Sequence, residues 1–328
     1  MTYNLRRRLG VWLYVAVTLV GLLGTTSNAQ AEKIRVGLQN FLSYANIFIA
    51  IDKGYFRDAG LDIEATMIRG GGTATFAEVL SDQIDISSGA ITASMLNAVI
   101  KGAKVKVIAD KGQIRAANST NELWITKALH DSGVKDITGL KGKTVATSPP
   151  GGSDWLILAM MAEKYGLSVP NKDILAAGLP APERVKALES GTVAGAILVE
   201  PFISKADQTK TVRLMTVPDM MPAFQTAVYY VNESFLEQRA SDVQKFLGAL
   251  QKATVEYMNN PKDDQLVAIL SKYTKVSPDV IKGAVPVYFS RDAKVDIKSI
   301  DAAQDFLLKH KIISRKVAPE EFIIKSAM

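Results

Sequence analysis

The chain has 328 residues, with 39 basic and 33 acidic side chains, a formal net charge of +6 and no cysteine. This length can bury a sizeable core without disulfides, and the lack of cysteine excludes thiol nucleophiles and iron–sulfur clusters. The two histidines, His130 and His310, are far apart in the sequence, which disfavours a multi-histidine metal site or a Ser-His-Asp triad. We therefore expect no metal and no cofactor, and the dispersed charge does not indicate nucleic-acid binding.

The N-terminus has the pattern of a secretion signal. Three arginines, Arg6–Arg8, precede an apolar core over residues 9–24, and Ala29-Gln30-Ala31 provides an A-x-A cleavage site. Because the apolar core is short for a membrane-spanning helix, we predict a cleaved signal peptide over residues 1–31 rather than an anchor. Cleavage leaves a mildly basic, soluble, periplasmic chain, while Sec and twin-arginine export both stay open.

From residue 34 onward, apolar strands alternate with amphipathic helical patterns. The first series ends near residue 109, and the second begins near residue 122. The predicted strands of the first series span residues 34–38, 61–68, 84–87 and 105–109, and its helices span 46–52, 75–81 and 92–101. The predicted strands of the second series span 123–126, 143–147, 174–178, 194–199, 212–217 and 227–231, with helices over 154–165 and 182–189.

The two series resemble each other weakly. The helix–strand run over residues 76–88 matches the run over 184–200, with insertions elsewhere. Helices over 241–259, 263–273, 278–285 and 297–309 follow. This pattern predicts two α/β lobes of similar architecture, with loops at the carboxyl ends of their strands facing one another across a ligand cleft.

Three loops of the first series are candidates for ligand contact. Arg69-Gly70-Gly71-Gly72-Thr73 joins a strand to a helix start, which suits an anionic oxygen, although a flexible turn is the alternative. Ser87-Ser88-Gly89 ends a buried strand and offers hydroxyls. The third loop carries Phe41 and Tyr44, which could stack on a ligand or belong to the core.

The second series has two corresponding loops. Ser148 to Ser153 forms a stiff Pro-Pro-Gly-Gly turn in which Ser153 is a candidate N-cap. Glu200, before Pro201, either binds an N–H group of a ligand or stabilises its own helix start. Arg115 is a further candidate partner for an anion, with a solvated position the alternative.

Several of these segments resemble a known family. The runs AIDKGYFRDAGLDIE, LSDQIDISSGA, LKGKTVATSPPGG and LESGTVAGAILVEP are similar to those of ABC-importer substrate-binding proteins for nitrate, sulfonates, taurine and pyrimidine precursors, the NMT1/THI5-like group. The resemblance implies a type II periplasmic-binding fold, in which two α/β lobes joined by two crossovers close on a ligand like a hinge. It places residues 32–117 and 233–328 in the first lobe and 118–232 in the second.

The resemblance also implies a monomer that delivers a small ligand to the membrane subunits of an ABC permease. A sulfonate, a nitrate-like or carboxylate anion, or a pyrimidine or aromatic compound all fit the pattern. An extracytoplasmic enzyme or ligand sensor on the same fold is the alternative, disfavoured by the lack of cysteine and the scarcity of histidine. The positions that transfer to ligand-facing loops are Phe41, Tyr44, Gly72, Thr73, Ser88, Ser148, Gly152, Ser153 and Glu200.

Overall fold

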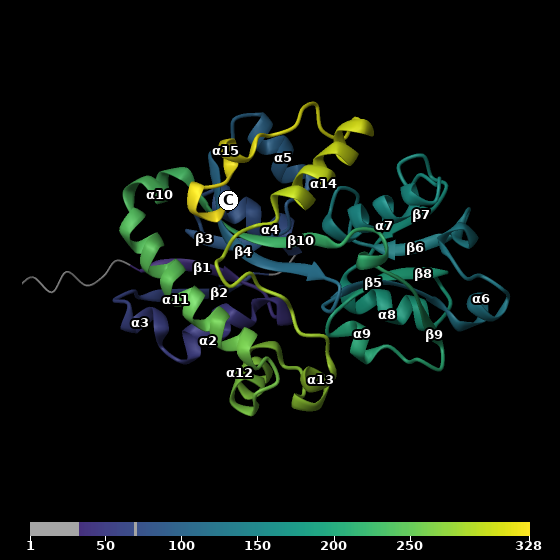
Figure 1. The fold of residues 1–328 in the computed structure, drawn as a ribbon, viewed down its shortest axis with the longest axis horizontal. Helices are drawn as coiled ribbons and strands as arrows, with labels where there is room; N and C mark the ends of the chain where they lie inside the picture. The colour runs from purple at the N-terminus through teal and green to yellow at the C-terminus, as the bar shows by residue number, and fades with distance from the viewer. Residues whose placement is uncertain (1–32, 69–70) are drawn as a thin grey trace, which may run out of the picture. The chain divides into compact units, whose positions relative to one another are not determined.

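The computed structural model describes residues 33–68 and 71–328. The predicted signal peptide and the start of the glycine loop at Arg69-Gly70 lie outside the described residues, as do the side chains of residues 71–73. Two five-stranded sheets organise the described chain, each surrounded by helices (Figure 1). Among the described residues, no helix combines the length and the apolar character that crossing a membrane requires.

The first sheet has the order β2-β1-β3-β10-β4. Strand β1 pairs in parallel with β2 and with β3, whereas β10 pairs antiparallel with both β3 and β4. Strand β4 therefore runs in the same direction as β1, and their carboxyl ends lie at one edge. The strands span Ile34–Leu38 (β1), Ile63–Met67 (β2), Ile86–Gly89 (β3), Val105–Arg115 (β4) and Ala223–Asn232 (β10).

The second sheet has the order β7-β6-β8-β5-β9. Strand β6 pairs in parallel with β7 and β8, and β5 pairs antiparallel with β8 and β9. The arrangement of strands therefore repeats that of the first sheet, as the internal similarity predicts. The strands span Asn121–Thr126 (β5), Thr144–Thr147 (β6), Leu175–Gly178 (β7), Gly195–Val199 (β8) and Thr211–Thr216 (β9).

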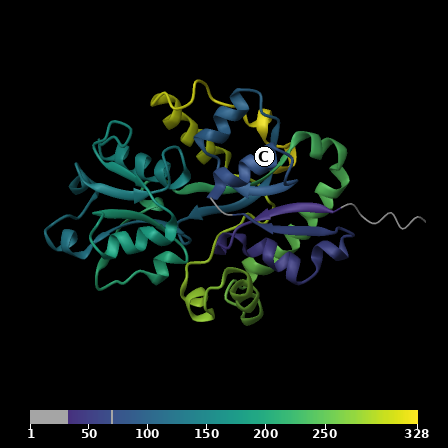
Figure 2. The same cartoon turned by 180° about the vertical axis from the view of Figure 1, so that it is seen from behind.

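Helices from both ends of the chain cover the first sheet. Helices α2, α11 and α12 enclose one apolar cluster with β1, and α4, α5 and α14 contribute to a second on the other face (Figures 1 and 2). The helices span Ala45–Asp52 (α2), Tyr55–Asp58 (α3), Gly71–Leu80 (α4), Ala93–Ile100 (α5), Glu233–Gln238 (α10), Ala240–Asn259 (α11), Asp264–Thr274 (α12), Pro278–Gly283 (α13), Ile297–Lys309 (α14) and Pro319–Phe322 (α15), with 3₁₀ turns at Leu42–Tyr44 (η1) and Lys325–Ala327 (η4).

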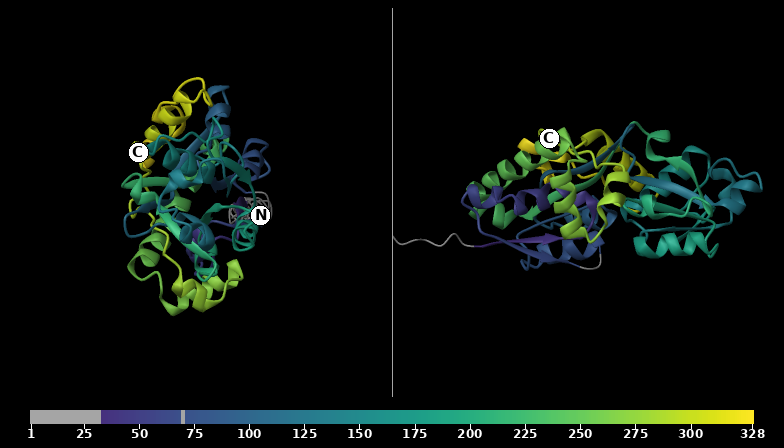
Figure 3. Two further views of the ribbon diagram at one scale, coloured as in Figure 1. Left: turned by 90° about the vertical axis from the view of Figure 1, so that its right-hand side faces the viewer. Right: turned by 90° about the horizontal axis from the view of Figure 1, so that it is seen from below.

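Four helices surround the second sheet, and the views from behind and below agree on this grouping (Figures 2 and 3). Helix α7 is almost entirely buried along its length. These helices span Lys127–Asp131 (α6), Ser153–Lys164 (α7), Ala181–Glu189 (α8) and Phe202–Lys205 (α9), with 3₁₀ turns at Ile137–Leu140 (η2) and Val217–Asp219 (η3).

Two strands differ from their predicted form. Residues 64–67 of β2 are exposed on both faces, rather than on one, because β2 is the edge strand of its sheet. Strand β4 continues to Arg115, six residues beyond its predicted end, because the polar residues after Ala109 pair with β10.

The pairing of β10 also bears on the lobes. Residues 223–232 belong to the first sheet, although they fall within the predicted second lobe. The chain thus passes to the second sheet between β4 and β5 and returns between β9 and β10. A local apolar pattern does not show which sheet a strand joins. The sequence therefore did not place the second crossover before β10.

A buried ion pair stabilises the second lobe. Asp154, at the start of α7, accepts a hydrogen bond from Arg184 Nη1 at 2.6 Å and another from Asn121 Nδ2 at 2.9 Å. Arg184 also donates to the carbonyls of Leu179 and Ile197. The pair therefore ties α7, α8 and two strands together.

We expect Arg184→Leu to lower the free energy of unfolding by about 3–5 kcal/mol, because it leaves the Asp154 carboxylate buried without its cation. Urea denaturation followed by circular dichroism measures this. The double variant Arg184→Leu/Asp154→Leu should recover part of the loss. Equal stability of Arg184→Leu and the wild type would contradict the role given to the pair.

Candidate functional site

The facing strand ends of the two sheets touch directly at one point. The backbone N–H of Ala93, at the start of α5, donates to the carbonyl of Gly151 at 3.1 Å. Gly151 has a φ of +81°, which favours glycine, and a β-carbon there would lie 3.2 Å from Ala93 Cβ. The loop after β6 therefore meets the loop after β3, as the predicted cleft requires.

Side chains of α7 and α14 extend this contact between the lobes. The rings of Trp155 and Phe306 meet edge to face, with centroids 6.5 Å apart. Glu163 pairs with Lys309 and lies 3.3 Å from His310 Nε2. One apolar cluster consequently runs from the second sheet into the first.

Two buried hydroxyls at the strand ends lack a partner. Ser88 lies at the end of β3 and Thr147 at the end of β6, and the side chains of both are fully buried. Of the buried side-chain N and O atoms in the described chain, Ser88 Oγ and Thr147 Oγ1 are the two without a hydrogen-bond partner. Burying a hydroxyl without a partner costs free energy, and buried hydroxyls of this kind often bind a ligand or a water molecule.

The loop after β1 carries the two predicted aromatic residues. Tyr44 is buried; its hydroxyl donates to the carbonyl of Ser88 at 3.3 Å, and its ring stacks on Phe48. Burial raises the pKa of the Tyr44 hydroxyl well above its usual range. Phe41 is half-buried and packs against the same apolar cluster. These contacts favour the core interpretation of both rings, and stacking on a ligand stays a prediction.

Sequence reasoning missed Lys111, which lies beside this loop. Its Nζ donates to Ser43 Oγ at 3.0 Å and lies 3.6 Å from the centroid of the Tyr44 ring. Burial lowers the pKa of the Lys111 ammonium to about 7. Lys111 follows the predicted strand over residues 105–109 by two positions, and no loop motif marks it, so no ligand contact was predicted there.

Helix α4 begins at Gly71, four residues before its predicted start, so Gly72 and Thr73 lie in its first turn rather than in a loop. The Thr73 side chain lies outside the described part of the chain. Gly152 is the N-cap residue of α7, so the prediction that Ser153 caps this helix is wrong. The side chain that satisfies the helix start is that of Ser148, because its hydroxyl accepts a hydrogen bond from the backbone N–H of Trp155 at 3.1 Å.

Glu200 has protein partners for both carboxylate oxygens. Oε1 accepts from the Ser204 hydroxyl and the Val285 N–H, each at 3.1 Å, and Oε2 accepts from the Ser204 N–H at 3.3 Å. The contact with Ser204 stabilises the start of α9, and the contact with Val285 reaches the segment after α13. These bonds favour the structural alternative for Glu200 over ligand binding.

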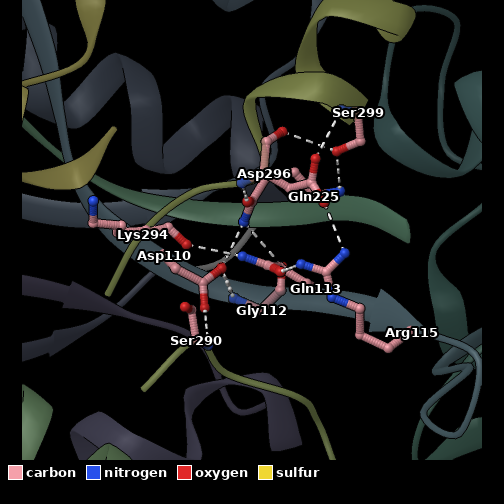
Figure 4. A network of polar contacts seen from close by, with 9 residues as sticks. All are labelled: Asp110, Gly112, Gln113, Arg115, Gln225, Ser290, Lys294, Asp296 and Ser299. Atoms are coloured by element: carbon pink, nitrogen blue, oxygen red, sulfur yellow. Dashed lines mark hydrogen bonds and ion pairs between the residues drawn. The ribbon is translucent and has the colours of Figure 1, made fainter. Parts of the chain in front are cut away.

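A network of polar contacts joins the crossover strands to residues 284–299 (Figure 4). Arg115, at the end of β4, pairs with Asp296 at 2.7 Å and donates to Gln113 Oε1. These contacts within the protein do not favour the prediction that Arg115 binds an anion. Gln225 of β10 donates to the Asp110 carboxylate at 2.7 Å and accepts from the Asp296 N–H at 2.7 Å.

Asp110 lies at the centre of this network (Figure 4). Its carboxylate also accepts from the N–H groups of Gly112, at 3.0 Å, and Ser290, at 2.8 Å. Burial raises the pKa of Asp110 to about 6, and these hydrogen bonds oppose the increase. Within residues 33–68 and 71–328, no cluster of three or more His, Asp or Glu side chains is arranged to hold a metal ion.

A family model described as NMT1/THI5 like matches residues 42–264. The match covers the first sheet except β1, the whole second sheet and the long helix α11. The chain belongs to the NMT1/THI5-like family.

Two relatives from Bacillus subtilis align with nearly the whole chain. The "Putative binding protein YtlA" is 24% identical over 330 residues, covering 96% of each chain. The "Putative aliphatic sulfonates-binding protein" is 25% identical over 303 residues, covering 90% of this chain and 86% of its own.

Solved structures share the fold. The ligand-binding component of an ABC-type import system from Staphylococcus aureus has a TM-score of 0.74 at 17% identity, covering 90% of this chain and 97% of its own. The periplasmic aliphatic sulphonate binding protein SsuA of Escherichia coli has a TM-score of 0.72 at 18% identity, covering 90% and 92%. The desulfurization enzyme DSZB has a TM-score of 0.62 at 16% identity, covering 90% and 97%. The chain therefore has the periplasmic-binding-protein fold that the resemblance implied.

The raised pKa of Asp110 predicts how stability depends on pH. The folded state holds a proton on Asp110 up to about pH 6, whereas the unfolded state loses it near pH 4. The resulting contribution, on the order of 2–3 kcal/mol, is complete below pH 4 and is lost as the pH rises through 6. Urea denaturation at pH 4 to 7 measures it. The variant Asp110→Asn cannot ionise, so its stability should not decrease between pH 4 and 6. The control variant Asp279→Asn, at an exposed position, should keep the wild-type decrease. Identical pH profiles for Asp110→Asn and the wild type would refute the role given to Asp110.

The unpartnered hydroxyls predict two stabilising substitutions. Ser88→Ala and Thr147→Val should each raise the free energy of unfolding of the ligand-free protein by about 1 kcal/mol, because each removes a buried group without a partner. Ser87→Ala is the matched control: the Ser87 hydroxyl donates to the carbonyl of Gly37 at 3.2 Å, so its loss should destabilise. A decrease for Ser88→Ala as large as that for Ser87→Ala would show that Ser88 has a structural role.

Proposed function

We propose that this protein is the substrate-binding component of an ABC importer. It binds a small organic ligand between its two lobes outside the cytoplasm, closes around it, and presents the closed form to the membrane subunits of a permease. The observation that carries this proposal is the pair of unpartnered buried hydroxyls, Ser88 and Thr147, one at a strand end of each sheet. A ligand held between the lobes would supply both with a partner.

Family membership and the fold support the proposal. The structures with this fold include a ligand-binding component of an ABC-type import system and a periplasmic sulphonate-binding protein. The predicted signal peptide supports a periplasmic location, and we propose that the protein acts as a monomer without a cofactor. With β10 in the first sheet, we place the second lobe at residues 118–222 and the rest of the mature chain in the first.

We further propose that the ligand lies against the strand-end loops of both lobes. The first lobe contributes the Phe41–Tyr44 segment, the first turn of α4 with Gly72 and Thr73, and Ser88. The second contributes Thr147 and the Ser148–Ser153 loop. A sulfonate, carboxylate or nitrate-like anion fits loops that lead into helix starts. The names of the sulfonate-binding relative and structure favour the same class.

An enzyme is the second candidate, since the desulfurization enzyme DSZB has the same fold. Catalysis by acid–base chemistry would need a carboxylate or imidazole free to face the cleft. Glu200 is the carboxylate among the predicted ligand-facing residues, and its two oxygens accept hydrogen bonds from Ser204 and Val285. This engagement favours binding over turnover.

Trp155 provides a direct test of binding and closure. The mature chain has two tryptophans, Trp124 and Trp155, so Trp124→Phe leaves Trp155, at the contact between the lobes, as the single reporter. We expect its emission to shift on titration with the molecule that co-purifies with the protein, identified by mass spectrometry after denaturation. Binding, followed independently by calorimetry, should match the emission change.

Trp155→Phe, which keeps Trp124 in the second sheet, is the control and should bind the same molecule with little change in emission. Absence of any co-purifying molecule, together with no heat of binding for sulfonates, carboxylates, nitrate and pyrimidines, would argue against a solute receptor. Consumption of a bound compound by the wild type would favour the enzyme.

A further inference from the structure

Lys111 occupies an irregular position in β4. Along the pairing with β10, Val228 faces Asp110 and Ala227 faces Gly112, so the register skips Lys111. An extra residue of this kind is a β-bulge, a feature that redirects a side chain and is frequent next to active sites. Because β4 runs parallel to β1, the bulge lies toward the strand ends that face the second lobe.

The Lys111 ammonium is buried and forms no ion pair, although the charge of the neighbouring Asp110 acts on it. The residue is 3% exposed, and its hydrogen-bond acceptor in the described chain is the neutral Ser43 hydroxyl. No carboxylate of the described chain pairs with it, and the neighbouring Asp110 carboxylate is bound by Gly112, Gln225 and Ser290. An ammonium has three donors, so Lys111 retains unused hydrogen-bonding capacity.

Tyr44 connects this cation to the ligand cleft. Lys111 Nζ lies against the face of the Tyr44 ring, and the Tyr44 hydroxyl donates to the carbonyl of Ser88. The hydroxyl of the same Ser88 is unpartnered and fully buried. The Tyr44 side chain therefore contacts the buried Lys111 ammonium through its ring and the backbone of Ser88 through its hydroxyl, so it links the ammonium to the residue that carries the unpartnered hydroxyl.

Burying a charge without a counter-charge is costly, and proteins seldom retain the arrangement for stability alone. The contact with the Tyr44 face compensates part of the cost, and the lowered pKa of Lys111 reflects the remainder. A ligand carrying a negative charge would remove this cost on binding. A neutral pyrimidine would leave it in place.

We propose that Lys111 binds the anionic group of the ligand, and that the ligand is a small carboxylate or sulfonate rather than a neutral ring compound. This inference rests on the proposed function and specifies its ligand class. Ser88 would donate its hydroxyl to the same ligand, so the first lobe alone would hold the charged end before closure. Lys111 is then a specificity-determining residue.

The test compares three variants of the mature protein, stripped of ligand by unfolding and refolding. Lys111→Met removes the charge at similar volume, and Lys111→Arg keeps it. Lys106→Met is the matched control on the same strand, since Lys106 pairs with Glu233 at 3.3 Å and donates to the carbonyl of Glu321. Thermal melting of the ligand-free proteins comes first. Lys111→Met should melt at or above the wild-type temperature and Lys106→Met at or below it, whereas a fall for Lys111→Met larger than that for Lys106→Met would make Lys111 a structural residue.

Calorimetry then compares anions with neutral compounds of matched shape: methanesulfonate with methanesulfonamide, benzoate with benzamide, and the molecule that co-purifies with the wild type. We expect each anion that binds to lose about 30-fold or more in affinity in Lys111→Met. Lys111→Arg and Lys106→Met should retain binding, and the co-purified molecule should carry an acidic group.

Two results would overturn the inference while leaving the solute receptor intact: a neutral compound bound as tightly as its anion, or a co-purified ligand bound equally by Lys111→Met and the wild type. A wild type that carries no molecule and binds none of the four compounds, nitrate or a pyrimidine would instead remove the proposed function, and the inference with it.

Discussion

The hydrogen bonds that hold β4 and β10 against residues 284–299 are the constraint on which the rest of the molecule depends. These strands adjoin the two crossovers, so their position decides which edge of the first sheet faces the second. Asp110 and Gln225 form hydrogen bonds there with each other and with backbone groups of Gly112 and Asp296. Because buried networks are costly to break in part, this region holds the two crossover strands and residues 284–299 together.

Apolar periodicity was sufficient to predict the strands and the longer helices, whereas the short helices α3, α6, α9, α10 and α15 were not predicted. The long helices α11 and α14 begin and end within one residue of their predicted bounds, because each buries a continuous apolar stripe. The second half of β4 could not be predicted in this way. Four of the six residues from Asp110 to Arg115 are polar or charged. They are extended because β10 and residues 284–299 supply partners for them, and these segments are far away in the sequence.

The candidate site was predicted in part, for a related reason. Ser88 was selected because it ends a strand, and that position follows from the alternation of elements. Glu200 was selected by the same rule, but whether its carboxylate faces a ligand depends on Ser204 and Val285, and Val285 is 85 residues away. Lys111 was missed because nothing local marks a bulge: only the pairing with β10 shows that the register skips it.

The close approach of Ala93 and Gly151 has a consequence for selection by size. The backbones of the two lobes meet there through one hydrogen bond, with no side chain between them. If the protein binds its ligand as proposed, a molecule too long to fit between these two loops would hold these atoms apart, and the bond would not form. Such a molecule could occupy the first lobe and still never produce the closed outline that a transporter would recognise. Discrimination among chemically similar compounds would then follow from their length, through a contact that none of them touches.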